Sequence, residues 1–203
     1  MHFTHVGHLT AIGQDGLLSD SAAQRTVSFK IEAGNVGIKE QRRQRPVPVP
    51  PGGVIADYVP FYFAARSPMM SAIANGKVPT YRGTCDELVY LVSSVERIIE
   101  LGLPAVFTDR NAVLRVARFS NDPSDLDSMI DWNLMKARYW YNTDEEPDRR
   151  ERRMAECLIH KQVPWAAFLG VAVKSETWAR QARAALEAAG ASSTIAVRPE
   201  WYF

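Results

Sequence analysis

The segment from Pro46 to Gly53, PVPVPPGG, limits the local conformation of the chain more strictly than any other stretch. Each proline lacks an amide donor and moves the residue before it out of the helical region, so the segment must be extended and turning. A basic run, KEQRRQR at residues 39–45, precedes it, and residues 19–37 before that are small and polar. We therefore expect a long irregular connection from residue 19 to Gly53. A core strand from Val54 to Phe63, interrupted near Pro60, should follow.

The second constraint is a glutamate inside an apolar stretch. Residues 155–160, AECLIH, are typical of a short strand, and alternation places Glu156, Leu158 and His160 on one of its faces. Glutamate is depleted from strands, so Glu156 needs a partner or a function. Two interpretations remain open at this point. The commoner one is a solvent-facing acid on an edge strand, and the other is a functional carboxylate.

Other elements carry clear boundary signals. Ser67 caps a helix that stops near residues 75–76, and Ser175 caps an amphipathic helix that Gly190 ends. Further strands are expected at residues 2–5, 87–93, 105–108, 168–173 and 194–197, and further helices at 9–14, 95–101 and 124–139. Strands and helices alternate without a regular βαβ rhythm. This predicts an α+β fold with a mixed sheet, in a single domain spanning residues 1–203.

Composition excludes several classes of protein. Of the 203 residues, 46% are hydrophobic and 23% are charged, as in an ordinary globular chain rather than a disordered one. Two cysteines, Cys85 and Cys157, are too few for a disulfide framework and indicate a reducing compartment. No apolar run reaches membrane-spanning length, and the first ten residues lack a signal-peptide layout. We expect a cytoplasmic protein that does not bind membranes.

Several kinds of chemistry lack their motifs. The chain has no Gly-x-Gly-x-x-Gly or Walker sequence, and its serines lack a nucleophile elbow. His2, His5 and His8 are spaced three apart, but a strand at this point would not bring them to one face. No cluster of acids or cysteines follows them. We expect no metal site.

Arginines interleaved with aromatic residues favour a nucleic-acid partner. The planar guanidinium suits phosphate, and aromatic faces suit unstacked bases, although each such residue alone is more often part of a core or a solvated face. The net charge is only +1, so attraction must come from local patches. The set comprises Arg42, Arg43, Arg45, Arg66, Arg110, Arg138, Arg149, Arg150, Arg152 and Arg153 with Tyr58, Tyr62, Tyr139, Trp140 and Tyr141.

Taken in order, the segments of the chain resemble the DarT family of DNA ADP-ribosyltransferase toxins. The resemblance covers essentially the whole chain. It is carried by HFTHVGHL at residues 2–9, IKEQRR at 38–43, PVPVPPGGVIADYVPFYFAARSPMM at 46–70, VFTDR at 106–110, RRMAECLIHKQVPW at 152–165 and WYF at 201–203. It implies an ADP-ribosyltransferase fold with NAD in a cleft. The implied activity is transfer of ADP-ribose from NAD to thymine in single-stranded DNA, with release of nicotinamide. It also implies a macrodomain antitoxin, similar to DarG, as partner.

The resemblance assigns the catalytic and cofactor residues. Glu156 matches the catalytic glutamate, and Arg42 matches an essential arginine on the loop that covers NAD, here residues 39–53. His2 and Thr4 match residues that contact NAD, and Leu18 is placed with them at the cofactor. A carboxylate near the anomeric carbon would stabilise the charge that develops as nicotinamide leaves. Arg42 would stabilise an anionic thymine.

The same resemblance places residues at the DNA. These lie at the start of the Ser67 helix and on a substrate loop, residues 138–155, and they are Arg66, Ser67, Pro68, Met69, Met70, Tyr139, Trp140, Arg149 and Arg150. Two departures concern the choice of base or sequence motif. Asn111 stands where relatives have histidine, and residues 19–24 lack an expected asparagine. The alternatives are the same transfer to guanine or RNA, and a non-enzymatic module that binds single-stranded nucleic acid.

Overall fold

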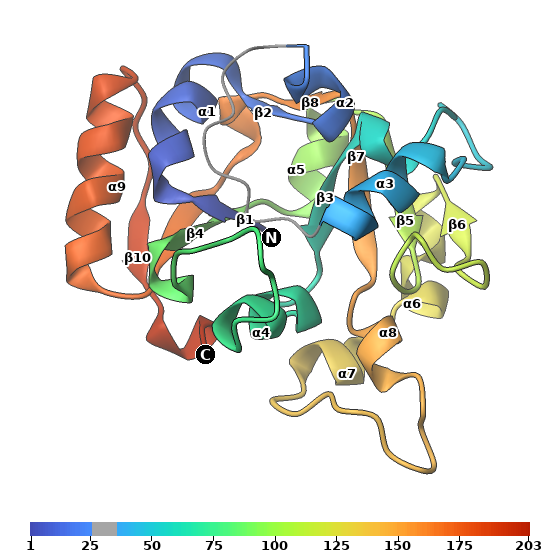
Figure 1. Cartoon of the computed structure of the whole chain (residues 1–203). Coiled ribbons are helices and arrows are strands. Elements are labelled where there is room, and N and C mark those ends of the chain that lie inside the picture. The colour runs from blue at the N-terminus through green and yellow to red at the C-terminus, as the bar shows by residue number, and fades with distance from the viewer. Residues whose placement is uncertain (26–35) are drawn as a thin grey trace.

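Two four-stranded sheets and a short two-stranded pair form the frame of the protein (Figure 1). The computed structural model describes residues 1–25 and 36–203, with only the backbone of Val36. The first sheet has the order β1-β4-β9-β10, with β1 at His2–His5, β4 at Leu88–Val92, β9 at Gly170–Val173 and β10 at Ile195–Val197. The second has the order β3-β7-β5-β6, with β3 at Tyr58–Tyr62, β7 at Glu156–His160, β5 at Ala105–Thr108 and β6 at Phe119–Ser120. The pair joins β2 at Leu17–Leu18 to β8 at Gln162–Val163.

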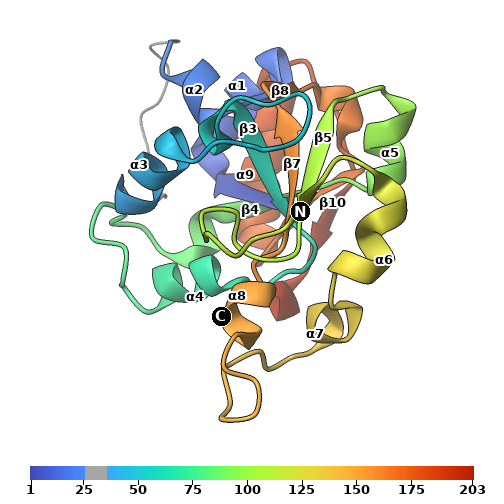
Figure 2. The same ribbon diagram turned by 90° about the vertical axis from the view of Figure 1, so that its right-hand side faces the viewer.

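Helices surround the sheets (Figures 1 and 2). They are α1 at Leu9–Asp15, α2 at Asp20–Ala23, α3 at Val36–Gln44, α4 at Pro68–Ala74, α5 at Val95–Glu100, α6 at Leu126–Met129, α7 at Trp132–Lys136, α8 at Arg149–Arg152 and α9 at Glu176–Ala188. Short 3-10 turns lie at Val6–His8, Ile55–Asp57, Cys85–Glu87, Pro123–Asp125, Trp165–Ala167 and Pro199–Trp201. Pairing between the named strands is antiparallel except between β9 and β10, so the first sheet is mixed and the second is antiparallel. The expected α+β single domain is confirmed.

The main core lies between the two sheets. Leu91 and Val171 of the first sheet contribute to it, as do Phe61 and Ile159 of the second, and Leu186 of α9 closes one side. Burial of such side chains contributes about 1.5–3 kcal/mol each. Because β7 sends Cys157 and Ile159 into this core, alternation directs Glu156, Leu158 and His160 to its other face.

The start of the chain joins the two sheets. The amide of Tyr62 donates to the carbonyl of Met1 at 2.8 Å, and the Met1 amine donates to the carbonyl of Tyr62 at 2.7 Å. Next to it, Nδ1 of His2 lies 2.8 Å from the carbonyl oxygen of Pro60. These contacts hold β1 along the free edge of β3 and so bring His2 to the second sheet.

Most of the predicted boundaries are confirmed. Ser67 caps α4 through its hydroxyl, which accepts from the amide of Met70 at 3.2 Å, and Gly190 ends α9 with φ 66°. Ser175 occupies the cap position of α9, but its side chain makes no capping bond. The proline-rich segment does turn back on itself, because Pro46 bridges to Val54 and the amide of Val47 donates to the carbonyl of Gly53 at 2.9 Å.

The predicted interruption at Pro60 is wrong. β3 runs unbroken from Tyr58 to Tyr62, with Pro60 opposite Leu158. The carbonyl of Pro60 faces away from β7 toward His2, and in an antiparallel strand the nitrogen of the same residue points the same way. The missing amide hydrogen therefore removes no bond between β3 and β7. This is how an edge strand tolerates proline.

The irregular connection expected from residue 19 to Gly53 is also wrong in part. Residues 26–35 lie outside the described residues, but α2 forms before them, and the basic run is helical up to Gln44. Lysine, glutamate, glutamine and arginine all favour helices. Within α3 the carboxylate of Glu40 accepts from Gln44 at 2.8 Å and from Arg43 at 3.4 Å, the spacing at which helical side chains meet.

Candidate active site

Glu156 is buried and held in place by two donors. It begins β7, which lies between β3 and β5 and is not an edge strand, and only 1% of the residue is exposed. The interpretation of Glu156 as a solvent-facing acid is therefore wrong. Nη1 of Arg42 donates to Oε1 at 2.9 Å and to Oε2 at 3.3 Å, and the amide of Ala112 donates to Oε2 at 3.1 Å. A cation and a backbone amide thus fix the direction of the carboxylate.

The strand neighbour of Glu156 also holds its backbone. Thr108 ends β5 opposite Glu156, and its hydroxyl accepts from the amide of Glu156 at 3.2 Å. The same hydroxyl donates to the carbonyl of Arg110 at 2.8 Å. Thr108 and Ala112 are contributors that sequence reasoning missed. A backbone amide carries no residue signature, although the VFTDR segment and the pairing of its strand beside Glu156 would point to them.

Arg42 has one guanidinium nitrogen, Nη2, that makes no hydrogen bond to Glu156. Its side chain is 14% exposed, and Nη2 is buried without a hydrogen-bond partner among the described residues. An unsatisfied buried donor costs about 1–3 kcal/mol. The unmet donor lies on the guanidinium that already contacts Glu156, which fits a site where a ligand supplies an acceptor.

Helix α3, which carries Arg42, is anchored by an acid on α2. Asp20 accepts from Lys39 at 2.8 Å and from Nε and Nη2 of Arg43 at 3.1 and 3.0 Å. Partial burial opposes ionisation of Asp20, but the hydrogen bonds from Lys39 and Arg43 outweigh it and hold the pKa of its carboxyl below the usual value. This ion-pair group positions the last turn of α3, and with it Arg42, over the start of β7.

His2 presents a neutral imidazole. Its Nδ1 must carry the proton, because the Pro60 oxygen at 2.8 Å can only accept. Burial lowers the pKa of His2 to about 4, against the contribution of that hydrogen bond, so near pH 7 the ring is uncharged and Nε2 is an acceptor. His2 reaches the site across β3, on which Tyr62 stands opposite Glu156. Burial, and the charge of Glu156 next, raise the pKa of the Tyr62 hydroxyl and keep it protonated.

The other predicted cofactor residues lie on neighbouring elements. The hydroxyl of Thr4 is 2.9 Å from Nδ1 of His8. Leu18 is half-buried in β2 and pairs with Gln162, just after β7. Within the described residues, neither His2 nor Thr4 hydrogen-bonds to Glu156 or Arg42. The structure therefore places Arg42 and Glu156 in contact and brings His2 to the adjoining strand. The roles of these residues, and those of Thr4 and Leu18, stay predictions.

The predicted DNA residues at α4 are mostly inside the protein. Ser67 is 1% exposed and Met70 is fully buried, and Pro68 is buried beside them while Met69 is half-buried. Arg66 has φ 54°, and its guanidinium donates to the carbonyl of Tyr202 and lies 4.2 Å from the ring centre of Phe203. The buried side chains shape this corner, and a contact of Arg66 with DNA stays a prediction.

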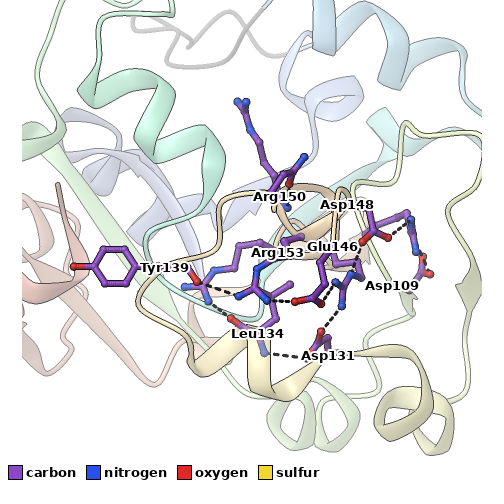
Figure 3. A network of polar contacts seen from close by, with 12 residues as sticks. Asp109, Asp131, Leu134, Tyr139, Glu146, Asp148, Arg150 and Arg153 are labelled. Carbon is purple, nitrogen blue, oxygen red and sulfur yellow. Dashed lines mark hydrogen bonds and ion pairs between the residues drawn. The ribbon is translucent and has the colours of Figure 1, made fainter. Parts of the chain in front are cut away.

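The substrate loop, residues 138–155, projects from the molecule together with α7 and α8 (Figures 1 and 2). Figure 3 shows the ion pairs at its base. Arg152 contacts Asp131, Glu146 and Asp148, and Arg110 donates to Asp148 at 3.2 Å. The first of these joins the loop to α7, and the last joins it to the loop that carries Ala112.

The four loop residues predicted to contact DNA differ in how far their side chains are exposed to solvent. Tyr139 is 68% exposed, and the backbone amide of Arg150 is bonded to Asn142 while its side chain extends to solvent. Trp140 is only 3% exposed and packs edge-on against Phe203, with ring centres 6.5 Å apart. Arg149 is half-buried and pairs with Glu146. Tyr139 and Arg150 are therefore the accessible members of this group.

Other features of the described residues lie apart from this site. A hollow of about 380 Å³ is lined mostly by apolar residues, among them Leu103, Phe107 and Pro123, and by none of the individually named site residues. Pro50 and Pro51, which also line it, belong to the loop predicted to cover NAD. Over residues 1–25 and 36–203, no three His, Cys, Asp or Glu side chains are grouped as a metal would need. No helix in that same part of the chain has the length and apolar character to cross a membrane.

Comparisons with known proteins cover the whole chain. The sequence model of a family described as "ssDNA thymidine ADP-ribosyltransferase, DarT" matches residues 1–203. A DNA ADP-ribosyl transferase of Thermus sp. (strain 2.9) is 36% identical over 208 residues, covering 100% of this chain and 94% of that protein. The structure of Thermus sp. 2.9 DarT in complex with ADP-ribosylated ssDNA superposes with a TM-score of 0.92, at 36% identity over 100% of this chain and 94% of that one. The complex of Thermus sp. 2.9 DarT with NAD+ gives a TM-score of 0.88 at 35% identity, over 100% and 96%.

Proposed function

The chain belongs to the DarT family of single-stranded DNA thymidine ADP-ribosyltransferases, and from this premise we propose that Glu156, Arg42, His2 and Thr4 carry its reaction. The protein is an enzyme that transfers ADP-ribose from NAD to DNA. The observation that carries the residue assignment is the contact of Arg42 with the buried Glu156, which leaves one guanidinium nitrogen without a partner in residues 1–25 and 36–203. Burial of a carboxylate and a guanidinium carries a desolvation cost, and buried ionisable groups in contact are often found at functional sites.

Each residue has a distinct task in this proposal. NAD supplies the ADP-ribosyl group and the nicotinamide that leaves, with positive charge developing on the sugar as their bond breaks. Glu156 stabilises that charge and orients the sugar through a hydroxyl. The neutral His2 offers Nε2 as an acceptor and Thr4 offers its hydroxyl, so together they hold the nicotinamide ribose. Leu18 contributes apolar contact beside them.

In this proposal Arg42 acts on the thymine base of the DNA as well as on Glu156. Thymine N3 is a poor nucleophile while it is protonated, and a permanently charged guanidinium favours its anionic form. Nη2, which has no partner among the described residues, is the donor available for this. Residues 39–53, which include the last turns of α3 and the proline-rich turn, cover NAD in this proposal. The substrate loop and the corner at Arg66 to Met70 hold the DNA.

The test is transfer to defined oligonucleotides. The protein is incubated with NAD and single-stranded DNAs that differ in one base, with matched RNA strands alongside, and the products are measured by mass spectrometry. Addition of one ADP-ribose only to strands that contain thymine is the expected result. Addition to guanine or to RNA would move the proposal to those substrates. Folded protein that modifies no strand and gains no thermal stability from NAD would instead favour a non-enzymatic binding module.

The biological setting is a further part of the proposal. Members of this family are toxins, and we expect expression in a bacterial cytoplasm to arrest growth. A macrodomain antitoxin similar to DarG would reverse the modification. A solved protein described as Thermosipho africanus DarTG, with ADP-ribose bound, shares the fold at a TM-score of 0.77 and 17% identity. Co-expression of a macrodomain that removes ADP-ribose from the modified DNA should restore growth, and a hydrolysis-deficient macrodomain should not.

A further inference from the structure

Arg153 is a buried cation whose guanidinium has only backbone partners in the described part of the chain. It lies between α8 and β7, three residues before Glu156, and it is 4% exposed. Nη1 donates to the carbonyls of Leu134 at 2.5 Å, Met135 at 2.9 Å and Ala137 at 3.2 Å, and Nη2 donates to the carbonyl of Ala65 at 2.7 Å. Figure 3 shows Arg153 beside Leu134, behind the ion pairs of the loop.

Burial of the Arg153 guanidinium costs free energy of folding, so its presence at this place indicates a role for the side chain. Burial lowers the pKa of the Arg153 guanidinium to about 10, and its Nε has no partner among the described residues. An apolar side chain of the same volume would avoid the desolvation of the charge. Only arginine, however, presents several donors in a rigid planar fork that can reach separate carbonyls at once.

The four carbonyls belong to segments that meet at the base of the substrate loop. Leu134, Met135 and Ala137 form the end of α7, where helix carbonyls have few internal partners. The Leu134 carbonyl also accepts from the amide of Ala137 at 3.1 Å. Ala137 directly precedes the substrate loop, and Arg153 lies near the end of that loop. One side chain thus closes the loop at its base. Through Ala65 the same side chain also holds the residue that precedes Arg66 and α4.

We propose that Arg153 is a positioning residue that fixes the substrate loop and the corner at α4 as one surface in front of Glu156. It sets the affinity for DNA rather than the chemical step. The inference rests on the proposed function, because it assigns these two segments to the DNA. Arg153 touches neither Glu156 nor Arg42, so its removal leaves the partners of the catalytic carboxylate in place.

The test compares Arg153→Met, which keeps an unbranched side chain without donors, with Arg153→Lys, which keeps the charge and some donors. The control is Arg97→Met, because Arg97 also donates from Nε and Nη2 to a backbone carbonyl, that of Ala166, outside the loop. It differs from Arg153 in that its side chain is 34% exposed and also pairs with Glu100. Apparent KM for a thymine oligonucleotide, kcat at saturating DNA, and the thermal shift with NAD are measured for each. Hydrogen exchange of residues 138–152 is measured without DNA.

Arg153→Met is expected to raise the KM for DNA about tenfold, since a shift of this kind in a positioning element is costly. Faster exchange in residues 138–152 should accompany it, with the NAD thermal shift unchanged. The KM and the exchange rate of Arg153→Lys should lie between those of Arg153→Met and those of the native protein. Arg97→Met should match the native protein in both. If Arg153→Met fails to fold, the lysine variant carries the test.

Two results would overturn the inference. One is folded Arg153→Met or Arg153→Lys protein with native KM and native exchange in the loop. The other is a proportional loss of NAD binding and kcat with no separate effect on KM, as a general structural role would give. A native protein that modifies no DNA would remove the proposed function, while the exchange measurement would still decide whether Arg153 closes the loop.

Discussion

A single nitrogen of Arg42 reaches both carboxylate oxygens of Glu156, at 2.9 and 3.3 Å, although the two residues are 114 positions apart in the chain. The remaining terminal nitrogen of Arg42 is buried and without a partner in the described residues. In this ion pair the carboxylate of Glu156 is therefore fixed, while Arg42 keeps one guanidinium nitrogen that has no acceptor among the described residues. Helix α3 and strand β7 are joined at the site by this contact.

The ion pair should contribute measurably to stability. Arg42→Met leaves Glu156 as a buried charge that keeps only the amide of Ala112, and removing one partner of a buried pair costs about 3–5 kcal/mol. We expect a loss of about 3 kcal/mol in the free energy of unfolding, measured by urea denaturation. Adding Glu156→Gln to this variant should recover much of the loss, because the uncompensated charge is then gone.

Arg97 provides the control for this experiment. It lies on α5, away from the site, and pairs with Glu100, the two side chains being 34% and 64% exposed. Such exposed pairs contribute about 0–1 kcal/mol. A loss for Arg42→Met no larger than that for Arg97→Met would contradict the importance of the buried pair.

His2 should make stability depend on pH in the acid range. Its pKa is lowered from 6.5 to about 4 by burial, so between these values the unfolded chain binds a proton that the folded protein excludes. The contribution of the neutral ring is complete above pH 6.5 and is lost as the pH falls through 6.5 to about 4. The slope is at most about 1.4 kcal/mol per pH unit.

His2→Gln isolates this effect. The difference in unfolding free energy between the native protein and the variant should be flat above pH 6.5 and should shrink toward pH 4. The Met1 amine has its pKa lowered to about 5 by burial and titrates between that value and 8. It is present in both proteins, so its own contribution cancels in the difference, apart from its repulsion of a protonated His2. A difference that does not change between pH 4 and 7 would show that His2 titrates normally in the folded protein.

Substitution of two adjacent aromatic residues in the substrate loop should affect different properties, DNA affinity for one and stability for the other. Tyr139 is 68% exposed, so Tyr139→Ala should change stability by less than about 0.5 kcal/mol while weakening binding of a thymine oligonucleotide by about 1–3 kcal/mol. Trp140 is 3% exposed, so Trp140→Ala should cost about 3 kcal/mol of stability. Urea denaturation and fluorescence titration with the oligonucleotide measure the two effects. Tyr139→Ala protein with native affinity for DNA would remove this residue from the interface.

Local chemistry explains which features the sequence could predict. The cap of α4 at Ser67 and the turn at Pro46–Gly53 depend on hydroxyl, proline and glycine geometry within a few residues, and both were expected. The strand at residues 156–160 follows from a short apolar run. The assignment of Glu156 as an important acid came from the family resemblance together with its unusual place in that strand.

Longer-range features could not be read in this way. Burial of Glu156 depends on strands β3 and β5, which come from distant parts of the chain, so the residues of its own segment favour an edge position. The helical form of α3 is not evident from its pattern of charges, although lysine, glutamate, glutamine and arginine all favour helices. Trp140 and Met70 were placed at the DNA by alignment, and only packing against Phe203 and the core separates them from the accessible Tyr139.

The most direct test of the account is the rate of ADP-ribose transfer to a thymine oligonucleotide by Glu156→Gln. This change keeps the size of the side chain and an acceptor for the Arg42 and Ala112 donors but removes the negative charge. Glu100→Gln, a change on a side chain that is 64% exposed, is the control. We predict that Glu156→Gln keeps its thermal shift with NAD and loses about 10²–10³-fold in rate, while the control keeps the native rate. Folded Glu156→Gln protein that modifies the oligonucleotide at the native rate would contradict the central role of this carboxylate.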